Sequence, residues 1–211
     1  EIQEAGGEIA RSDTKADAAT ISALVKADVI EIFERDATPQ LGAITQSLLP
    51  TLSAEQSAAL ERINSGFQSR NVVLLHGVTS SGKTEIYTHP IAKALEKGED
   101  VLLLVPEISL TSQLVERMQR MFGERVISYH SKLTPARRTQ IYMDMLRSPS
   151  GNFIIGARSA LFLPYKKLGL VVVDEEHDTS YKQSEPNPRY HGRDAAIMLA
   201  SLHNAKTILG S

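Results

Sequence analysis

The stretch from Leu74 to Tyr87, LLHGVTSSGKTEIY, decides which fold the chain is expected to adopt. Four residues separate Gly77 from Gly82, and Lys83 and Thr84 follow, which completes the G-x-x-x-x-G-K-[ST] pattern. An apolar run precedes this pattern and a helical run follows it, as a phosphate-binding loop between a strand and a helix requires. In such a loop, backbone N–H groups and the positive end of the helix point at phosphate oxygens. The stretch therefore predicts a nucleotide-phosphate site in an α/β fold.

Each residue type of this loop suits a different role in binding a nucleotide phosphate. Glycine lets the backbone approach a phosphate without a Cβ atom in the way. Lys83 is expected to reach the β- and γ-phosphates, and the Thr84 hydroxyl is expected to join a Mg²⁺ shell. The alternative is a glycine-rich strand-to-helix turn that holds no ligand. The predicted nucleotide-binding residues of the loop are Gly77, Thr79, Ser80, Ser81, Gly82, Lys83 and Thr84.

A second motif, LGLVVVDEEHD at Leu168–Asp178, supplies the acidic residues that a phosphate site needs. Its apolar residues end in Asp174, so a carboxylate is expected at the carboxyl tip of a buried strand, which is the edge where parallel sheets bind ligands. Asp174 is predicted to hold Mg²⁺, mostly through water. Glu175 is predicted to orient or deprotonate the attacking water, so Lys83 and Glu175 are the expected catalytic residues. The alternative is a solvated acidic loop after a strand.

The apolar runs of the chain predict the rest of this fold. Continuous apolar runs of four or five residues are typical of strands covered on both faces, and amphipathic stretches lie between them. This alternation predicts a doubly wound, mostly parallel sheet. Helices are predicted after Ser53, which has Gln56 at capping-box spacing, and at Pro135, which suits a first turn. The predicted strands are Val72–Leu75, Val101–Val105, Val126–Tyr129, Phe153–Ile155, Leu170–Val173 and Thr207–Leu209.

Residues 1–50 show a different pattern. Asp17 is predicted to cap a short helix whose apolar residues share one face. Val29–Arg35 is strand-like in its β-branched and aromatic content. A helix followed by a strand is compatible with a partial winged-helix-like segment, and a helical cap on the next domain is the alternative. Asp36–Ser53, which contains proline and glycine, is predicted to be a linker.

Composition limits the classes of protein to consider. The 211-residue chain is 42% hydrophobic and 23% charged, as ordinary globular chains are. No apolar run approaches the roughly 20 residues that span a bilayer, and no secretory signal is visible, so a cytoplasmic protein without membrane contact is expected. The chain has no cysteine, which excludes disulfides and thiolate metal sites within it. Because the net charge is −2, any contact with nucleic acid is expected to be local.

Several strings carry a resemblance to known motor proteins. They are LHGVTSSGKTEIY, LLLVPEISLTSQ, YHSKLTPARR, IIGARSALFLPYKKLGLVVVDEEHDTSYKQ and RYHGRDAAIMLA, with a D-E-x-H box at Asp174–His177. With these strings the chain resembles superfamily 2 helicases and, more narrowly, the primosomal protein N′ (PriA-type) family of replication-restart helicases. The resemblance implies a RecA-like first motor lobe at residues 51–211, preceded at residues 1–50 by the partial winged-helix-like segment and linker.

The resemblance also implies further site residues. Gln56 matches the family's adenine-contacting glutamine, and a capping box with Ser53 is its alternative role. PEISLTSQ, GARSALF and DTSYKQSEPNPRYHGRD match motifs on the DNA side, where hydroxyl and basic groups meet phosphates and tyrosines stack on bases. Their alternatives are an ordinary helix start and a long surface loop. The DNA-contact candidates are Ser109, Thr111, Gln113, Arg158, Ser159, Tyr181, Lys182, Arg189 and Tyr190.

By this resemblance the chain is the ATP-binding motor lobe of a 3′-to-5′ DNA helicase that restarts stalled replication forks and assembles the primosome. ATP and Mg²⁺ are the expected cofactors, and the expected partners are single-stranded and forked DNA, primosome proteins and single-strand-binding proteins. The family's second motor lobe, arginine finger, zinc module and DNA-end-binding domain are not in this sequence, so zinc is expected only in the full-length protein. Since arginine fingers contribute about 10³–10⁵ in rate, the lobe alone is expected to hold phosphates and barely turn over.

Other functions are compatible with parts of this pattern. Another superfamily 2 DNA translocase, such as a branch-migration motor, shares nearly every residue used here. A P-loop small-molecule kinase predicts a substrate lid and no DNA affinity, and the D-E-x-H box argues against it. A DNA-binding or primosome-docking module without catalysis conflicts with the presence of Lys83, Thr84, Asp174 and Glu175 together.

Overall fold

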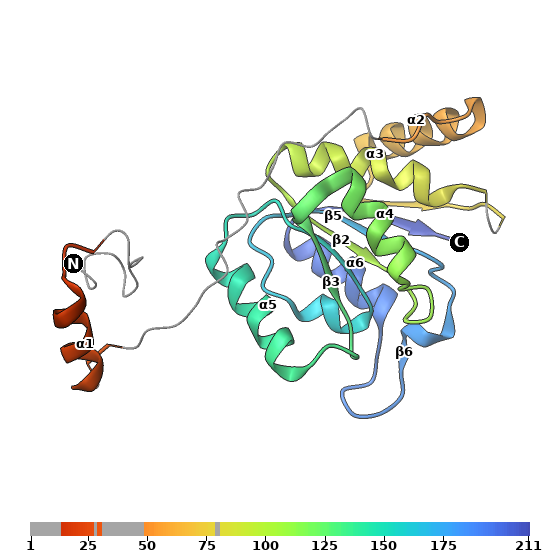
Figure 1. Cartoon of the computed structure of the whole chain (residues 1–211). Helices are drawn as coiled ribbons and strands as arrows, with labels where there is room; N and C mark the ends of the chain where they lie inside the picture. Colours follow the sequence, from red (N-terminus) through yellow and green to blue (C-terminus); the bar gives the residue numbers. More distant parts are fainter. Residues whose placement is uncertain (1–13, 28, 31–48, 79–80) are drawn as a thin grey trace. The chain divides into compact units, whose positions relative to one another are not determined.

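The computed structural model describes residues 14–27, 29–30, 49–78 and 81–211. The chain divides into two compact units, Glu1–Ala37 and Thr38–Ser211, which are described separately (Figure 1). In the first unit, helix α1 spans Ala18–Lys26, and the Asp17 side chain accepts a hydrogen bond from the Thr20 N–H at 2.8 Å, which confirms the predicted cap. Most of the predicted strand Val29–Arg35 and of the linker Asp36–Ser53 lies outside the described residues. The winged-helix interpretation therefore stays a prediction.

The second unit is built on a sheet of six parallel strands. Each contains one of the predicted apolar runs, except that Val105 of the run Val101–Val105 follows the last residue of β2, so the predicted doubly wound α/β sheet is confirmed. The strand order is β1-β8-β5-β2-β4-β3, which places β5 beside β2 and β8 between β1 and β5. The strands are β1 (Val72–Leu75), β2 (Asp100–Leu104), β3 (Val126–Tyr129), β4 (Phe153–Gly156), β5 (Leu168–Val173) and β8 (Lys206–Gly210).

Local signals set where the helices begin. Ser53 and Gln56 form a reciprocal capping box at the start of α2, and Pro135 is the first residue of α5 after the cap Thr134. Both predictions for these helix starts are confirmed. The helices are α2 (Ala54–Ser69), α3 (Lys83–Glu96), α4 (Ser112–Phe122), α5 (Pro135–Arg147) and α6 (Gly192–Leu202). Short elements are η2 (Gly123–Arg125), η3 (Arg158–Phe162), η4 (Thr179–Tyr181) and the hairpin strands β6 (Lys182–Gln183) and β7 (Tyr190–His191). No helix of the described ranges is both long and apolar enough to cross a membrane.

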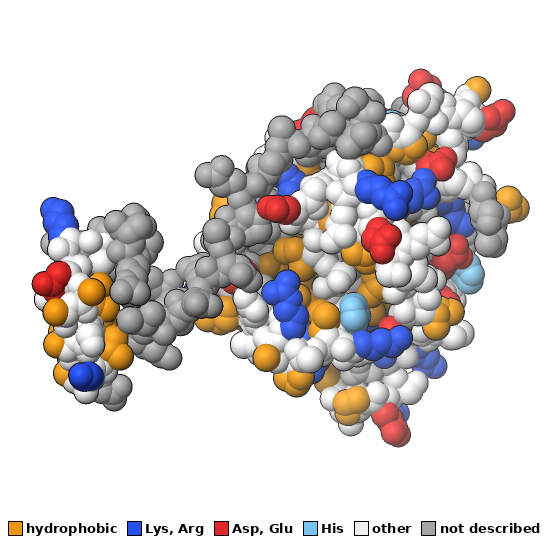
Figure 2. All heavy atoms as spheres, viewed as in Figure 1, with side chains coloured by type: hydrophobic (Ala, Val, Ile, Leu, Met, Phe, Trp, Pro, Cys, Tyr) orange, Lys and Arg blue, Asp and Glu red, His pale blue; other side chains and the backbone are white. Residues whose placement is uncertain are grey.

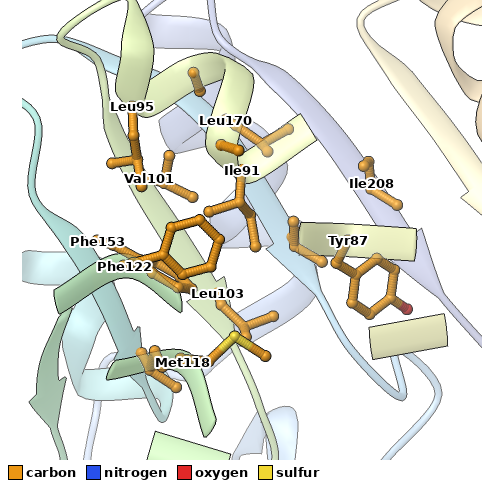
Figure 3. Packing of buried hydrophobic residues seen from close by; sticks show 14 of the residues in the cluster. Tyr87, Ile91, Leu95, Val101, Leu103, Met118, Phe122, Phe153, Leu170 and Ile208 are labelled. Carbon is orange, nitrogen blue, oxygen red and sulfur yellow. The ribbon is translucent and has the colours of Figure 1, made fainter. Parts of the chain in front are cut away.

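Two hydrophobic clusters cover the two faces of the sheet. Side chains alternate along β2, so that Val101 and Leu103 join the cluster under α2, α3 and α4, while Leu102 and Leu104 join the cluster under α5 and α6. In the first cluster, the rings of Phe122 and Phe153 meet edge to face with centroids 5.3 Å apart (Figure 3). Burial on both faces explains why these strands appear in the sequence as continuous apolar runs.

The two edges of the parallel sheet carry different kinds of residues. At the carboxyl edge, the phosphate loop follows β1, the PEISLTSQ segment follows β2, and Asp174 follows β5. At the amino edge, the buried Asp100 carboxylate accepts hydrogen bonds from the backbone N–H groups of Gly151 and Asn152 and from those of Lys166 and Lys167. Binding residues therefore gather at one edge, and a closed hydrogen-bond network lies at the other.

Candidate nucleotide-binding and DNA-contact site

The phosphate loop joins β1 to the first turn of α3. Gly82 is the residue before the helix and has φ +80°, a left-handed conformation that favours glycine. A Cβ atom at Gly77 would lie 2.9 Å from Ser81 Oγ, so a side chain there would require the Ser81 hydroxyl to move. The predicted loop residues Thr79 and Ser80 lie outside the described residues. The described part of the loop has the tight backbone that a phosphate cradle requires.

Lys83 lies inside this loop, with only 8% of its side chain exposed. Its Nζ donates a hydrogen bond to the Gly77 carbonyl oxygen at 2.9 Å and lies 3.3 Å from Glu175 Oε1. The lysine charge is thus directed into the loop and toward the acidic motif. Residues 83 and 175 are far apart in the sequence, and the sheet brings them together because β1 and β5 both flank β8.

The acidic motif begins where β5 ends. The Asp174 N–H donates to the Leu104 carbonyl oxygen at 2.9 Å, and the Glu176 N–H donates to the Gly210 carbonyl oxygen at 2.7 Å, so both neighbouring strands hold the turn. Between them, Glu175 adopts φ +47°, an uncommon value for a residue with a side chain. Such conformations cost energy and concentrate at functional sites. The turn therefore directs Glu175 toward Lys83 at a backbone cost.

Tyr87 positions the Asp174 carboxylate from α3. Its hydroxyl donates to Asp174 Oδ1 at 3.0 Å, and its ring is fully buried at the margin of the core with the oxygen pointing away from the cluster (Figure 3). Burial raises the pKa of Asp174, and the nearby Glu175 charge adds to this, while Tyr87 and Lys83 act in the opposite direction. Sequence reasoning missed Tyr87, although its place four residues after Lys83 puts both on one helix face.

Tyr181 differs from its predicted role in stacking on DNA bases. Only 1% of the residue is exposed, and its hydroxyl lies 2.7 Å from the Asp174 carbonyl oxygen and 3.1 Å from the Leu104 carbonyl oxygen. The ring packs in the core cluster beneath α6. In this position it is out of reach of a base, so the stacking role is not carried forward. Tyr181 instead supports the turn that carries Asp174.

The remaining residues of the D-E-x-H box have partners of their own. The Glu176 carboxylate accepts a hydrogen bond from Arg193 Nη1 of α6 at 2.9 Å. His177 Nδ1 lies 3.2 Å from Ser211 Oγ, and its Nε2 lies 3.7 Å from Glu175 Oε2. Glu176 is therefore tied to a helix, and Glu175 is the carboxylate of the motif that faces the loop lysine. Arg193 is a further residue that sequence reasoning did not single out.

Gln56 combines the two roles considered for it. Its Oε1 accepts a hydrogen bond from the Ser53 N–H at 2.8 Å, so the capping-box role is confirmed. Its Nε2 donates to Glu85 Oε2 at 2.9 Å, which places the amide beside the first turn of α3. The adenine contact stays a prediction, and the structure places the amide beside Gly82 of the phosphate loop.

The predicted DNA contacts of PEISLTSQ lie at the start of α4. Thr111 caps this helix, because its Oγ1 accepts from the Leu114 N–H at 3.2 Å, and its hydroxyl proton is left to donate elsewhere. Gln113 is exposed, and Ser109 is half-buried. Both the ordinary helix-start role and a phosphate contact are compatible with this geometry.

A second group of candidates surrounds the β6–β7 hairpin. The predicted long loop is thus partly an ordered antiparallel hairpin, in which Lys182 pairs with His191. Lys182 and Arg189 are exposed, and Tyr190 meets the exposed Phe162 edge to face at a centroid distance of 5.7 Å. The hairpin therefore presents a basic and aromatic surface, of which sequence reasoning missed Phe162.

Arg158 and Ser159 lie beside this hairpin in η3. A Cβ atom at Gly192 would lie 3.1 Å from Arg158 Cγ, so the arginine packs directly against the start of α6. Arg158 Nη1 and Ser159 Oγ are buried and have no hydrogen-bond partner among the described residues. Unpaired buried donors are costly, and a ligand oxygen would satisfy them.

The donor set suits Mg²⁺ with a nucleotide more than a metal bound by protein alone. No group of three His, Cys, Asp or Glu side chains able to hold a metal occurs within 14–27, 29–30, 49–78 and 81–211. Mg²⁺ usually takes one or two carboxylates together with substrate phosphates and waters. Thr84 follows the loop lysine and Asp174 stands at the end of β5, so a hydroxyl and a carboxylate are offered at this edge.

A family model matches the part of the chain that carries this site. The model of the DEAD/DEAH box helicases matches residues 53–211. The chain belongs to the DEAD/DEAH box helicase family. This membership confirms the RecA-like helicase fold and does not favour the small-molecule kinase alternative. DEAD/DEAH box helicases bind ATP and Mg²⁺, which confirms these cofactors in general terms.

Curated relatives of this chain include several replication restart proteins PriA. Replication restart protein PriA of Bacillus subtilis is 40% identical over 205 residues, which cover 94% of this chain and 25% of that relative. Replication restart protein PriA of Helicobacter pylori is 45% identical over 166 residues, which cover 79% of this chain and 26% of that relative. The chain thus spans about a quarter of the length of these relatives. Their names agree with the family that the sequence strings indicate.

Solved structures agree on the fold. The structure of RecG bound to a three-way DNA junction is 23% identical to this chain, with a TM-score of 0.56. The match covers 80% of this chain and 22% of that one. At this identity the likeness shows the arrangement of the sheet and helices alone.

Proposed function

We propose that the chain is the ATP-binding motor lobe of a 3′-to-5′ DNA helicase that restarts stalled replication forks and assembles the primosome. The observation that carries this proposal is the 3.3 Å contact between Lys83 Nζ and Glu175 Oε1, which joins the phosphate loop to the acidic box. The similarity to PriA proteins supports the choice of replication restart over branch migration.

The proposed chemistry divides among the chain's own residues. Bound ATP and Mg²⁺ supply the phosphoryl group that is transferred and the charge that activates it. Lys83 neutralises the β- and γ-phosphates, and Gly82 offers a backbone N–H group, as Thr79 and Ser80 are also predicted to do. The N–H groups of Gly77 and Ser81 donate to the carbonyl oxygens of Ser211 at 2.9 Å and Val78 at 3.1 Å, so both would have to exchange these partners for phosphate oxygens. Thr84 and Asp174 hold the metal ion. Glu175 accepts a proton from the attacking water at its carboxylate and orients that water.

The proposed DNA surface runs along the carboxyl edge of the sheet. Its members are Ser109, Thr111, Gln113, Arg158, Ser159, Lys182, Arg189 and Tyr190, to which the Phe162 ring is added. Positive and negative side chains are interleaved on the face shown in Figure 2. This mixture supports DNA contacts through a few local basic side chains rather than through one large positively charged surface. Single-stranded and forked DNA are the proposed ligands of this surface.

The wider setting of the lobe is part of the same proposal. Residues 51–211 form the first motor lobe, and residues 1–50 form a partial winged-helix-like segment with a linker. Primosome and single-strand-binding proteins are the proposed partners, zinc belongs to a separate module of the full-length protein, and the protein acts in the cytoplasm. The similarity to PriA over about a quarter of the relatives' length supports these assignments.

Replacing Lys83 in the full-length protein tests the proposal. Lys83→Ala removes the cation that neutralises the phosphates, so ATP-driven unwinding should be abolished, while DNA binding without nucleotide should persist because the lysine points into the loop. Lys93→Ala is the matched control, since Lys93 is exposed on the same helix. Strand separation and filter binding with single-stranded and forked DNA report the two activities. Unwinding by Lys83→Ala at the wild-type rate would refute the proposal.

A further inference from the structure

Glu85 joins three helices beside the phosphate loop. It lies in the first turn of α3, where its Oε2 accepts a hydrogen bond from Gln56 Nε2 of α2 at 2.9 Å. Its Oε1 accepts a hydrogen bond from Arg117 Nη2 of α4 at 3.0 Å. The carboxylate thus bridges the helix that carries Gln56 and the helix that follows the PEISLTSQ segment. None of the roles proposed above uses this residue.

The partners of Gln56 determine which way its amide faces. The Ser53 N–H can only donate, so it requires the amide oxygen, and a carboxylate can only accept, so Glu85 requires the amide nitrogen. The hydrogen bond from Gln56, helped by Arg117, lowers the pKa of Glu85 against the opposing effect of burial. Glu85 therefore remains an ionised carboxylate at neutral pH, and it can only accept hydrogen bonds.

The Gln56 amide lies against the phosphate loop. Among the described residues, each of its two polar atoms uses only part of its hydrogen-bonding capacity. A Cβ atom placed on Gly82 would collide with Gln56 Nε2, so the amide sits directly beside the loop backbone. Its two partners in the described part of the chain leave one lone pair on Oε1 and one N–H on Nε2. The corresponding edge of adenine offers the N6 donor and the N7 acceptor, whereas guanine offers two acceptors, O6 and N7. The open groups match adenine and oppose guanine.

We infer that Glu85 is a positioning residue that sets the preference of the site for adenine over guanine by fixing the Gln56 amide. The inference rests on the proposed function, in which Gln56 contacts the base of the bound nucleotide. Arg117 holds the Glu85 carboxylate from the opposite side, so its second oxygen stays turned toward α2. Without the carboxylate, the Ser53 N–H alone holds the amide, which can then turn its nitrogen toward the two acceptors of guanine more easily.

Nucleotide affinity, rather than turnover, tests this inference. Glu85→Gln keeps the size of the side chain but replaces one acceptor oxygen by a donor, so only the Ser53 N–H still favours one orientation of the Gln56 amide. Fluorescently labelled ATP and GTP are titrated into the full-length protein in the presence of Mg²⁺. The ratio of the GTP to the ATP dissociation constant should fall by about 3- to 10-fold in the variant, the size expected of one hydrogen bond. Glu61→Gln, an exposed change on α2, should leave the ratio unchanged.

A double-variant comparison separates positioning from a purely structural role. In a Gln56→Ala background the amide is absent, so adding Glu85→Gln should not lower the ratio further. An unchanged ratio in Glu85→Gln, a wild-type protein that binds ATP and GTP alike, or a further drop in the Gln56→Ala background would overturn the inference. Lys83→Ala distinguishes this outcome from failure of the proposed function. If Lys83→Ala binds nucleotide as the wild type does, the phosphate site itself is misassigned.

Discussion

Two aspartates lie at opposite ends of neighbouring strands in the same sheet. Asp100 begins β2, is 1% exposed, and accepts hydrogen bonds from four backbone N–H groups and from Asn152 Nδ2 at 3.1 Å. Asp174 follows β5 and accepts a hydrogen bond from the Tyr87 hydroxyl at 3.0 Å. Its pKa is raised by burial, so the groups around it do not compensate for the loss of water.

The difference separates a carboxylate that holds the fold from one that is proposed to bind Mg²⁺. The donors around Asp100 tie together the segments before β2, β4 and β5, which makes this carboxylate a structural joint of the amino edge. Asp174 lies at the carboxyl edge beside Lys83 and Glu175, and fewer donors surround its carboxylate than surround Asp100 in the described part of the chain. A carboxylate beside a phosphate loop is the kind of ligand that Mg²⁺ takes together with substrate phosphates.

The largest expected effect falls on turnover at the carboxyl edge. In the full-length protein, Glu175→Gln should lower DNA-stimulated ATP hydrolysis by about 10²–10⁴, because an amide cannot accept a proton from water. Nucleotide affinity should stay within a few-fold, since Lys83, Thr84 and Asp174 are unchanged. Phosphate release and titration with a fluorescent ATP analogue measure the two properties separately. If both fall together, Glu175 maintains the shape of the site rather than its chemistry, and if neither falls, the water is activated elsewhere.

The next effect falls on stability at the amino edge. Asp100→Asn should lower the free energy of unfolding by about 2–4 kcal/mol, because the new amide nitrogen faces N–H groups that need an acceptor. Denaturant unfolding followed by circular dichroism measures the loss. Glu124→Gln, an exposed change in η2, is the control. Should Asp174→Asn cost as much stability as Asp100→Asn, the contrast between the two edges would not hold.

A smaller effect is expected for an exposed side chain of the carboxyl edge. Phe162→Ala should weaken the affinity for single-stranded DNA by about 1–3 kcal/mol, the size of one base stacked on an aromatic ring. Leu202→Ala is the matched control, because Leu202 is 75% exposed at the end of α6 that leads to the amino edge, compared with 65% for Phe162. Fluorescence anisotropy with a labelled oligonucleotide reports both. Equal weakening by the two variants would argue against a stacking role.

The smallest effect distinguishes two buried tyrosines, one near each aspartate. Tyr87→Phe removes the hydrogen bond to Asp174, and Tyr165→Phe removes one to the Ala160 carbonyl oxygen. Each should cost about 0.5–1.5 kcal/mol of stability. Tyr87→Phe alone should also lower ATP turnover, because Asp174 loses the hydrogen bond that positions it. The expected loss is roughly 10-fold, which corresponds to a rise of about 1.4 kcal/mol in the activation free energy. Thermal unfolding and steady-state hydrolysis test the pair, and an equal loss of turnover in Tyr165→Phe would contradict the assignment.

The elements of the fold were largely predictable because their signals are local. Each predicted apolar run lies within a strand, except for Val105 just after the end of β2, since a strand buried on both faces needs apolar residues throughout. The caps at Asp17 and Ser53 and the proline start at Pro135 depend only on the chain within one helical turn. The phosphate loop needs its glycines, lysine and threonine at fixed spacing, so that part of the site is visible in the sequence alone.

Contacts between distant segments could not be predicted in this way, because they depend on the order of the strands and on the packing of helices over them. The same tyrosine in the same motif suits a solvent-facing stack or a core position, and packing under α6 buried Tyr181. Tyr87 meets Asp174, and Glu85 meets Gln56 and Arg117, only because the sheet and its helices bring these segments together. Local sequence specifies which chemical groups are available, and burial in the folded chain selects which of them are held and which are left for a ligand.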